Sequence, residues 1–310
     1  MAVAVEGITA GTLPQQHRRA VQDGQRTLAH RRLSEVFETA KSVPFDDSSR
    51  IVLFSDCHRG DNSRADAFAR NEDLFLQALT HYYREGFTYV EVGDGDELWK
   101  NRRFSAIRDA HGRIFDLLHR FDLQNRLHLI VGNHDIQGSQ RNWVEKDGMI
   151  AHEGLILRYS RTGQRIFVVH GHQADFKSDR FYVASRFVAR YIWRRVQLLT
   201  LGSRPSGAGD SRNRGKIRQR ITEWMQANRQ IVICGHTHRP MCAAYGEPPY
   251  FNTGSCLYSG YITGLEIQNG EIVLVKWSIR PEARQGEALR IERELMSPPR
   301  KLRLFGQYIN

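Results

Sequence analysis

Side chains that can bind a metal ion recur in five short motifs of this chain. The motifs are Asp56-x-His58, Gly93-Asp94, Gly132-Asn133-His134-Asp135, His170-Gly171 and Gly235-His236-Thr237-His238. Their donor atoms are carboxylate oxygens, an amide oxygen and imidazole nitrogens. This set suits a catalytic site for Mn, Fe or Zn better than a structural zinc site, which would use cysteine.

The spacing within the motifs has a geometric reason. In an extended segment, residues i and i+2 point to the same side, so Asp56 and His58 can hold one ion together. The same applies to His236 and His238 with a slight turn. The glycines in the motifs let the backbone bend sharply and approach the ions. One carboxylate shared by two cations offsets their repulsion, and Asp94 is the candidate for this bridge.

Each motif alone is weak evidence for a metal site. A lone His170 is more often a satisfied core histidine than a ligand. Gly-Asn-His-Asp can be a turn with its asparagine in the left-handed conformation. What favours a metal site over coincidence is the ordered set, in which every member directly follows its own apolar run.

Five apolar runs rich in strand-forming residues precede the motifs. They cover residues 50–55, 87–92, 127–131, 166–169 and 230–234. Runs of this length predict strands that are buried on both faces. In open α/β sheets, the loops at the carboxyl ends of the strands line the ligand crevice, so the five motifs should meet there.

The segments between these strands indicate the fold class. Apolar residues at helical spacing predict helices over 64–85 and 104–121, which together with the strands indicate an α/β core. Asn269-Gly270 predicts a tight hairpin over 260–279. A weaker hairpin is expected over 155–169.

The chain divides into three predicted parts. Residues 1–45 are interpreted as an N-terminal helical extension with a helix over 14–42, and residues 46–280 as the domain that carries the motifs. Residues 281–310 are interpreted as a basic C-terminal tail. The interval between the fourth and fifth motifs is longer than a link between strands needs, and we interpret residues 173–222 as a helical lid insertion.

Composition limits the class of protein. Of the 310 residues, 40% are hydrophobic and 25% are charged, as in soluble globular proteins. Neither a membrane-spanning apolar run nor the apolar segment of a secretory signal is found, so we expect a soluble, cytoplasmic protein. Four cysteines without a C-x-x-C pair fit reduced thiols. The net charge of +11 favours anionic partners.

The order D-x-H, G-D, G-N-H-D, H-G and G-H-x-H resembles the calcineurin-like metallophosphoesterase superfamily, over residues 51 to about 279. The resemblance implies a four-layer α/β sandwich, in which two mixed β-sheets pack face to face and helices cover the outside. It also implies two divalent metal ions, with Mn as the first choice and Fe, Zn or Co as alternatives. The ligands of one ion would be Asp56, His58, Asp94 and His238, and those of the other would be Asp94, Asn133, His170 and His236.

The same resemblance implies a mechanism. A hydroxide generated between two ions attacks phosphorus, and His134 faces the phosphate or the leaving group as proton donor or electrostatic stabiliser. Glu97, three residues after the bridging Asp94, would orient His134 and favour its charged form. Residues expected to contact the substrate are Arg59, Asn133 and Arg239. For Arg59, an exposed position on a loop is the alternative.

Two features of the sequence narrow the range of possible substrates. Gly93-Asp94-x-x-Glu97-x-Trp99 and the run from Gly235 to Pro240 resemble UDP-diacylglucosamine pyrophosphohydrolases, in which a helical lid binds the lipid substrate. Here residues 173–222 are aromatic and basic, with 12 Lys and Arg residues against three Asp residues. Such a lid fits a phosphorylated lipid or small molecule and a peripheral contact with the inner face of the membrane, unless its aromatic side chains pack on the core. His134 departs from that subfamily, where many members have arginine.

Two other functions compete with this interpretation. A nuclease or nucleotide phosphodiesterase would use the basic lid to bind nucleic acid, but the charge is concentrated in one segment and no nucleic-acid module is recognisable. We therefore do not expect a nucleic-acid partner. A non-catalytic scaffold with the same fold would be expected to lose ligands, and all seven are present.

Overall fold

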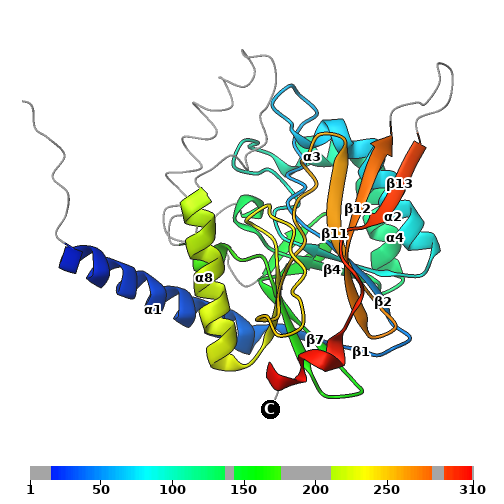
Figure 1. Cartoon of the computed structure of the whole chain (residues 1–310). Coiled ribbons are helices and arrows are strands. Elements are labelled where there is room, and N and C mark those ends of the chain that lie inside the picture. The colour runs from blue at the N-terminus through cyan, green and yellow to red at the C-terminus, as the bar shows by residue number, and fades with distance from the viewer. Residues whose placement is uncertain (1–14, 137–142, 176–210, 281–289, 309–310) are drawn as a thin grey trace, which may run out of the picture.

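Two β-sheets with a shared apolar interface form the centre of the protein (Figure 1). The computed structural model describes residues 15–136, 143–175, 211–280 and 290–308. Helices cover the outer face of each sheet, so the described elements stack in four layers. This arrangement confirms the predicted α/β sandwich of two mixed sheets flanked by helices.

The first sheet has five strands in the order β1-β7-β8-β9-β10. The strands β7 and β8 pair antiparallel, whereas the other neighbours pair parallel. The bounds are β1 Lys41–Phe45, β7 Gly154–Tyr159, β8 Arg165–Val169, β9 Ile231–Cys234 and β10 Tyr250–Asn252.

The second sheet has nine strands, with β13-β12-β11-β2-β3-β4-β6-β5 in order and β14 beside β12. The strands β2, β3, β4 and β6 run parallel, and antiparallel strands flank them. The bounds are β2 Arg50–Phe54, β3 Thr88–Val92, β4 Leu127–Ile130, β5 Trp143–Lys146, β6 Met149–His152, β11 Tyr261–Gln268, β12 Glu271–Arg280, β13 Arg290–Leu295 and β14 Arg300–Lys301.

The helices are held against the sheets by two outer apolar clusters. The helices α2, Glu72–Arg84, and α4, Gly112–Leu123, pack on the nine-stranded sheet. The helices α1, Gln15–Thr39, and α8, Ser211–Asn228, pack on the five-stranded sheet. Figure 1 shows these two pairs of helices on opposite sides of the sheets.

All five apolar runs of the sequence are strands, as predicted. They correspond to β2, β3, β4, β8 and β9, and each is buried over most of its length. Every metal-binding motif starts within two residues of the carboxyl end of one of these strands. Because the strands occupy the middles of two facing sheets, their ends bring the five motifs to one edge of the sandwich.

The two predicted helices on the nine-stranded sheet are each shorter than expected. The first is preceded by the short helix η1, Phe68–Asn71, because Asp66 accepts the backbone N–H groups of Phe68 and Ala69. The second is divided into α3, Phe104–Ala110, and α4 at His111. The ring of His111 is buried and lies 2.9 Å from Asp66 Oδ2.

Both predicted hairpins are confirmed. The strands β11 and β12 pair antiparallel around Asn269 and Gly270, which have φ angles of 55° and 67°. Two consecutive left-handed residues are what a tight two-residue hairpin requires. The strands β7 and β8 form the second hairpin, with Gly163 at φ 74°.

The chain ends are more integrated than the prediction of an extension and a tail suggested. The helix α1 confirms the predicted N-terminal helix, and its residues Leu33 and Val36 are buried against the five-stranded sheet. The interpretation of residues 281–310 as a tail needs correction, because β13 pairs with β12 and the short helix η6, Leu302–Tyr308, buries Phe305. Most of the predicted lid, residues 176–210, lies outside the described residues, and the domain boundaries stay predictions.

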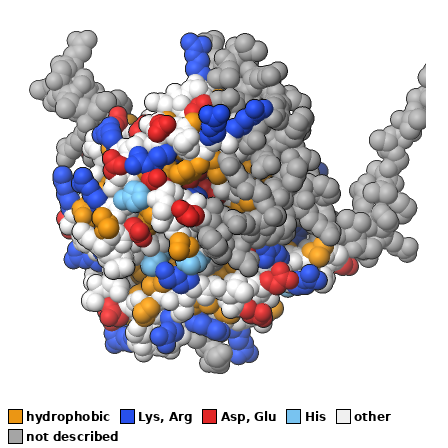
Figure 2. All heavy atoms as spheres, turned by 180° about the vertical axis from the view of Figure 1, so that it is seen from behind, with side chains coloured by type: hydrophobic (Ala, Val, Ile, Leu, Met, Phe, Trp, Pro, Cys, Tyr) orange, Lys and Arg blue, Asp and Glu red, His pale blue; other side chains and the backbone are white. Residues whose placement is uncertain are grey.

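Two features describe the surface. Among the described helices, none is long and apolar enough to cross a bilayer. On the face that Figure 2 shows, Lys and Arg side chains are interspersed with acidic and hydrophobic ones over the described surface. The positive charge of the described residues on this face is therefore not gathered into a single patch.

Candidate metal centre

Five predicted ligands have an unusual backbone conformation. Asp56, His58, Asp94, His236 and His238 all have φ angles between 48° and 61°. Residues other than glycine rarely adopt this left-handed region, which costs about 1–3 kcal/mol for each residue and is concentrated at functional sites. The surrounding structure therefore imposes this conformation in order to aim the side chains.

The first group of ligands contains Asp56, His58 and His238. Asp56 Oδ2 accepts hydrogen bonds from the Ser55 hydroxyl and from the backbone N–H of His236. Its other oxygen, Oδ1, lies 3.0 Å from His238 Nε2 and 3.8 Å from His58 Nε2. One carboxylate oxygen and two ring nitrogens thus converge on one point.

The second group contains Asp94, His170 and His236. Asp94 Oδ2 lies 3.1 Å from His170 Nε2 and 3.6 Å from His58 Nε2 of the first group. The same oxygen therefore faces both groups, as a bridging ligand must. His170 Nδ1 lies 2.8 Å from the Val92 carbonyl, which can only accept a hydrogen bond, so Nδ1 carries a proton and Nε2 is the nitrogen left to bind a metal ion.

Several buried atoms of the predicted ligands have no hydrogen-bond partner among the described residues. Leaving a buried polar atom unpaired costs about 1–3 kcal/mol, and a folded protein rarely tolerates several together. Divalent cations would satisfy such atoms, and carboxylate, amide and imidazole donors suit them. The residues present therefore fit a metal centre. Among the predicted ligands, the unpaired atoms are Asp56 Oδ1, both ring nitrogens of His58, Asn133 Oδ1 and His170 Nε2.

Electrostatics at the site favour positive charge. Burial by itself lowers the pKa of His58, but the nearby carboxylates of Asp56 and Glu97 raise that pKa to about 10. Burial likewise opposes the charged form of His170, yet Asp94 raises its pKa to about 9. In the absence of a cation, the carboxylates thus draw protons onto two ligand histidines, and a metal ion would have to displace these protons.

The predicted dyad is formed beside the first group. His134 Nδ1 lies 2.7 Å from Glu97 Oε1. Burial raises the pKa of Glu97, but the positive charges of His134 and Lys100 outweigh it and hold that pKa well below its usual range. Trp99 stacks on the His134 ring, with centroids 4.0 Å apart, and its indole N–H donates to the Asn133 carbonyl. The plane of the imidazole is therefore fixed from two sides.

Glycine is required where two ligand loops touch. A Cβ atom on Gly132 would lie 2.1 Å from Asp94 Oδ1, and one on Gly93 would lie 2.5 Å from His170 Nδ1.

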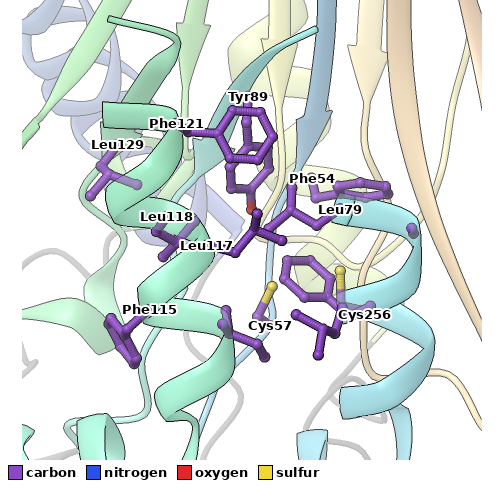
Figure 3. Close-up of a cluster of buried hydrophobic side chains, with 14 of the residues drawn as sticks. Phe54, Cys57, Leu79, Tyr89, Phe115, Leu117, Leu118, Phe121, Leu129 and Cys256 are labelled. Carbon is purple, nitrogen blue, oxygen red and sulfur yellow. The ribbon is translucent and has the colours of Figure 1, made fainter. Parts of the chain in front are cut away.

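The motif residue Cys57, between Asp56 and His58, points away from the ligands. Figure 3 shows its sulfur in the apolar cluster near that of Cys256, between α2 and α4.

The expectation for Arg59 is wrong in both of its forms. Arg59 is neither exposed on a loop nor placed to reach a phosphate, because its guanidinium is fully buried and paired with Glu91 and Asp96. Arg239 is exposed directly after His238, and its role as a substrate contact stays a prediction.

Two residues near the second group were not singled out from the sequence. His172 is buried, and its ring centroid lies 5.6 Å from that of His170. Asp175 Oδ2 lies 3.4 Å from His236 Nε2, where it can orient this ring. The H-G-H spacing from His170 was a usable signal for His172, whereas nothing in the local sequence marks Asp175.

Comparisons with known proteins agree with this site. The profile of the family described as calcineurin-like phosphoesterase matches residues 49–240, which contain all five motifs. No curated protein matches the chain.

Two similar solved structures share little sequence with this chain. Vps29 of Chaetomium thermophilum is 11% identical with a TM-score of 0.38, over 82% of this chain and 97% of that one. A cold-active protein-tyrosine phosphatase of a psychrophilic Shewanella species is 13% identical with a TM-score of 0.35, over 76% and 81%.

Proposed function

Because this chain belongs to the calcineurin-like phosphoesterase family, we propose that it is a metal-dependent hydrolase of a phosphate ester or pyrophosphate bond. The observation that carries the proposal is the position of Asp94. Its Oδ2 atom faces His58 of one ligand group and His170 of the other, and this is the arrangement that two adjacent ions need. The position of Asp94 between the two ligand groups therefore supports a centre with two metal ions.

The ligands divide between two ions in this proposal. One ion would be held by Asp56, His58, Asp94 and His238, and the other by Asp94, Asn133, His170 and His236. When bound, two divalent ions would supply Lewis-acid catalysis and lower the pKa of a water molecule. We propose Mn as the first choice of ion, with Fe, Zn or Co as alternatives, because oxygen and imidazole donors without a thiolate suit all of these metals.

His134 is the proposed proton donor to the leaving group. Its Nδ1 is engaged with Glu97, which leaves Nε2 available for a phosphate or leaving-group oxygen. The His134 side chain is 16% exposed whereas that of Glu97 is 3% exposed, so a substrate can reach the histidine and not its partner. Glu97 thus orients the ring of His134.

The substrate class is proposed to be a phosphorylated or nucleotide-linked lipid. Support comes from the Gly93-Asp94-x-x-Glu97-x-Trp99 motif and from the basic, aromatic composition of residues 173–222. The same composition would allow a peripheral contact with an acidic membrane surface.

Hydrolysis by metal-free protein reloaded with Mn tests this function. The substrates are p-nitrophenyl phosphate, bis-p-nitrophenyl phosphate and UDP-diacylglucosamine, and Asn133→Ala serves as the inactive control. A strong preference for the UDP-lipid would support the lipid substrate. Turnover of the small esters alone would contradict the lipid assignment and retain the phosphoesterase, whereas no turnover by metal-loaded protein would overturn the proposal. Salt-sensitive binding to nucleic acid would instead favour a nuclease.

A further inference from the structure

Five charged side chains lie buried under the metal-binding loops, outside the roles proposed above. Each is at most 2% exposed. Negative and positive charges alternate along the series, with three carboxylates and two cations, so the series carries one net negative charge. In order, the residues are Glu91, Arg59, Asp96, Lys146 and Asp135.

The contacts along this series are direct. The Nη1 and Nη2 groups of Arg59 each donate to an oxygen of Glu91 at 2.7 Å, and its Nε donates to Asp96 Oδ1 at 2.8 Å. The ammonium group of Lys146 lies 3.0 Å from Asp96 Oδ2 and donates to Asp135 Oδ1 at 2.6 Å. Each cation therefore joins two carboxylates.

The series connects three ligand loops. Arg59 follows the ligand His58, Asp96 follows Asp94 by two residues, and Asp135 follows Asn133 by two residues. Asp135 also accepts the backbone N–H groups of Asp96 and Gly132, both at 2.8 Å. The backbones of Arg59 and Gly95 are hydrogen-bonded as well.

The loops after β2, β3 and β4 are therefore cross-linked directly below their ligand atoms. The close fit extends to the backbone, since a Cβ atom on Gly95 would lie 1.9 Å from Glu91 Oε1. Even a methyl group would thus disturb the series.

A structural role alone does not account for such a series. Buried ion pairs lose the hydration of both charges, and apolar side chains of similar volume often stabilise a core as well or better. Groups that hold metal ligands from behind, in contrast, typically set metal affinity. Four members lie within three residues of a predicted ligand, and Lys146 contacts two of these four. This placement favours a role in holding the metal ligands.

We propose that Arg59 and Lys146 are positioning residues for the metal centre, and this inference rests on the proposed function. They act through Asp96 and Asp135 and hold Asp94 and Asn133 at the separation that a pair of ions requires. A shift of one loop against its neighbour would move Asn133 away from Asp94, and the centre would retain one ion more readily than two.

Manganese titration followed by electron paramagnetic resonance tests this role, because coupled and isolated Mn ions give different spectra. We expect Lys146→Met to weaken one of the two binding steps by about 10- to 100-fold and to replace the spectrum of a coupled pair by that of isolated ions. Lys146→Arg, which keeps the charge, should recover much of the pair. Arg59→Lys keeps the charge but loses the forked contact to Glu91, and it should weaken binding in the same direction.

A matched control separates this effect from general destabilisation. Arg293→Met removes a cation paired with Glu266, which lies on β11 opposite Val52 and away from the ligand loops. This variant should lower thermal stability and leave both manganese steps unchanged. If Lys146→Met fails to fold, Arg59→Lys carries the test.

The outcomes distinguish this inference from the proposed function. Folded Lys146→Met and Arg59→Lys proteins that bind two Mn ions with wild-type affinity and a coupled spectrum would overturn the inference alone. Wild-type protein that binds no pair of ions would overturn the proposed binuclear centre and the inference with it.

Discussion

His134 is the residue at which chemistry can be separated from metal binding, because its ring contacts Glu97 and Trp99 but belongs to neither proposed ligand set. We expect His134→Gln to lower kcat by about 100- to 10,000-fold on esters with alkyl leaving groups, which need a proton. The loss should be much smaller for p-nitrophenyl esters, whose leaving group departs as a stable anion. Steady-state kinetics on both kinds of ester, with the metal content of each protein measured, check this expectation.

Two outcomes would contradict the role of His134 as a proton donor. One is an equal loss of kcat on both classes of ester, which would indicate electrostatic stabilisation instead. The other is a loss of bound metal in His134→Gln, which would assign the histidine to the metal centre. Glu97→Gln is the companion variant, and it should follow the same pattern with a smaller loss because His134 remains.

His58 and His170 make metal binding depend on pH. Their pKa values are raised to about 10 and about 9 by neighbouring carboxylates, so both rings hold a proton at neutral pH when no cation is bound. Each ion must displace a proton, and the apparent affinity for Mn should rise as the pH increases from about 6.5 to about 8. Calorimetric titration in buffers of different ionisation enthalpy counts the protons released. Metal binding without proton release would contradict the protonated state.

At the scale of elements, the close contact between the loops after β3 and β4 depends on Gly132. A Cβ atom there would lie 2.1 Å from Asp94 Oδ1, so Gly132→Ala should force the two loops apart and weaken metal binding at least tenfold. Gly215→Ala in α8 is the control, because within the described part of the chain no atom outside its own helix and chain neighbours lies within 4 Å of its Cβ position. This substitution should leave metal binding unchanged and favour the helix by up to about 1 kcal/mol. Metal titration of both variants tests this expectation. Equal affinities of Gly132→Ala and Gly215→Ala for the metal would contradict the importance of the close contact at Gly132.

The elements that position the site could be predicted because their signals are local. The strands β2, β3, β4, β8 and β9 are rich in apolar residues, and each is followed within two residues by a glycine or a ligand. The edge strand β13 was missed because its sequence, Arg-Ile-Glu-Arg-Glu-Leu, is dominated by charges, which are common on exposed edges of a sheet. Its pairing with β12 is a long-range contact that the segment itself does not encode.

The buried charge series was missed for a related reason. Arg59 pairs with Glu91 and Lys146 pairs with Asp96, across 32 residues in the first case and across two strands of the sheet in the second. An arginine in a loop is usually exposed, and only the packing of β2 against β3 reveals that this one is not. Side chains that bind a metal can be recognised in the sequence by their residue type. Side chains that support the ligands can be recognised only from their contacts in the folded structure.

At the scale of the whole molecule, metal binding and folding should be linked. The ligands come from loops after five strands in both sheets, so the site exists only when the sandwich is assembled. An ion that binds the folded state alone stabilises it by about 2.7 kcal/mol at a free concentration 100 times its Kd. We therefore expect chelation to lower the Tm and added Mn to restore it. Asn133→Ala should show a smaller shift on adding Mn, because it removes a ligand of one ion. A Tm that is the same with chelator and with saturating Mn would mean that the convergent, unpaired ligand atoms do not bind the ion.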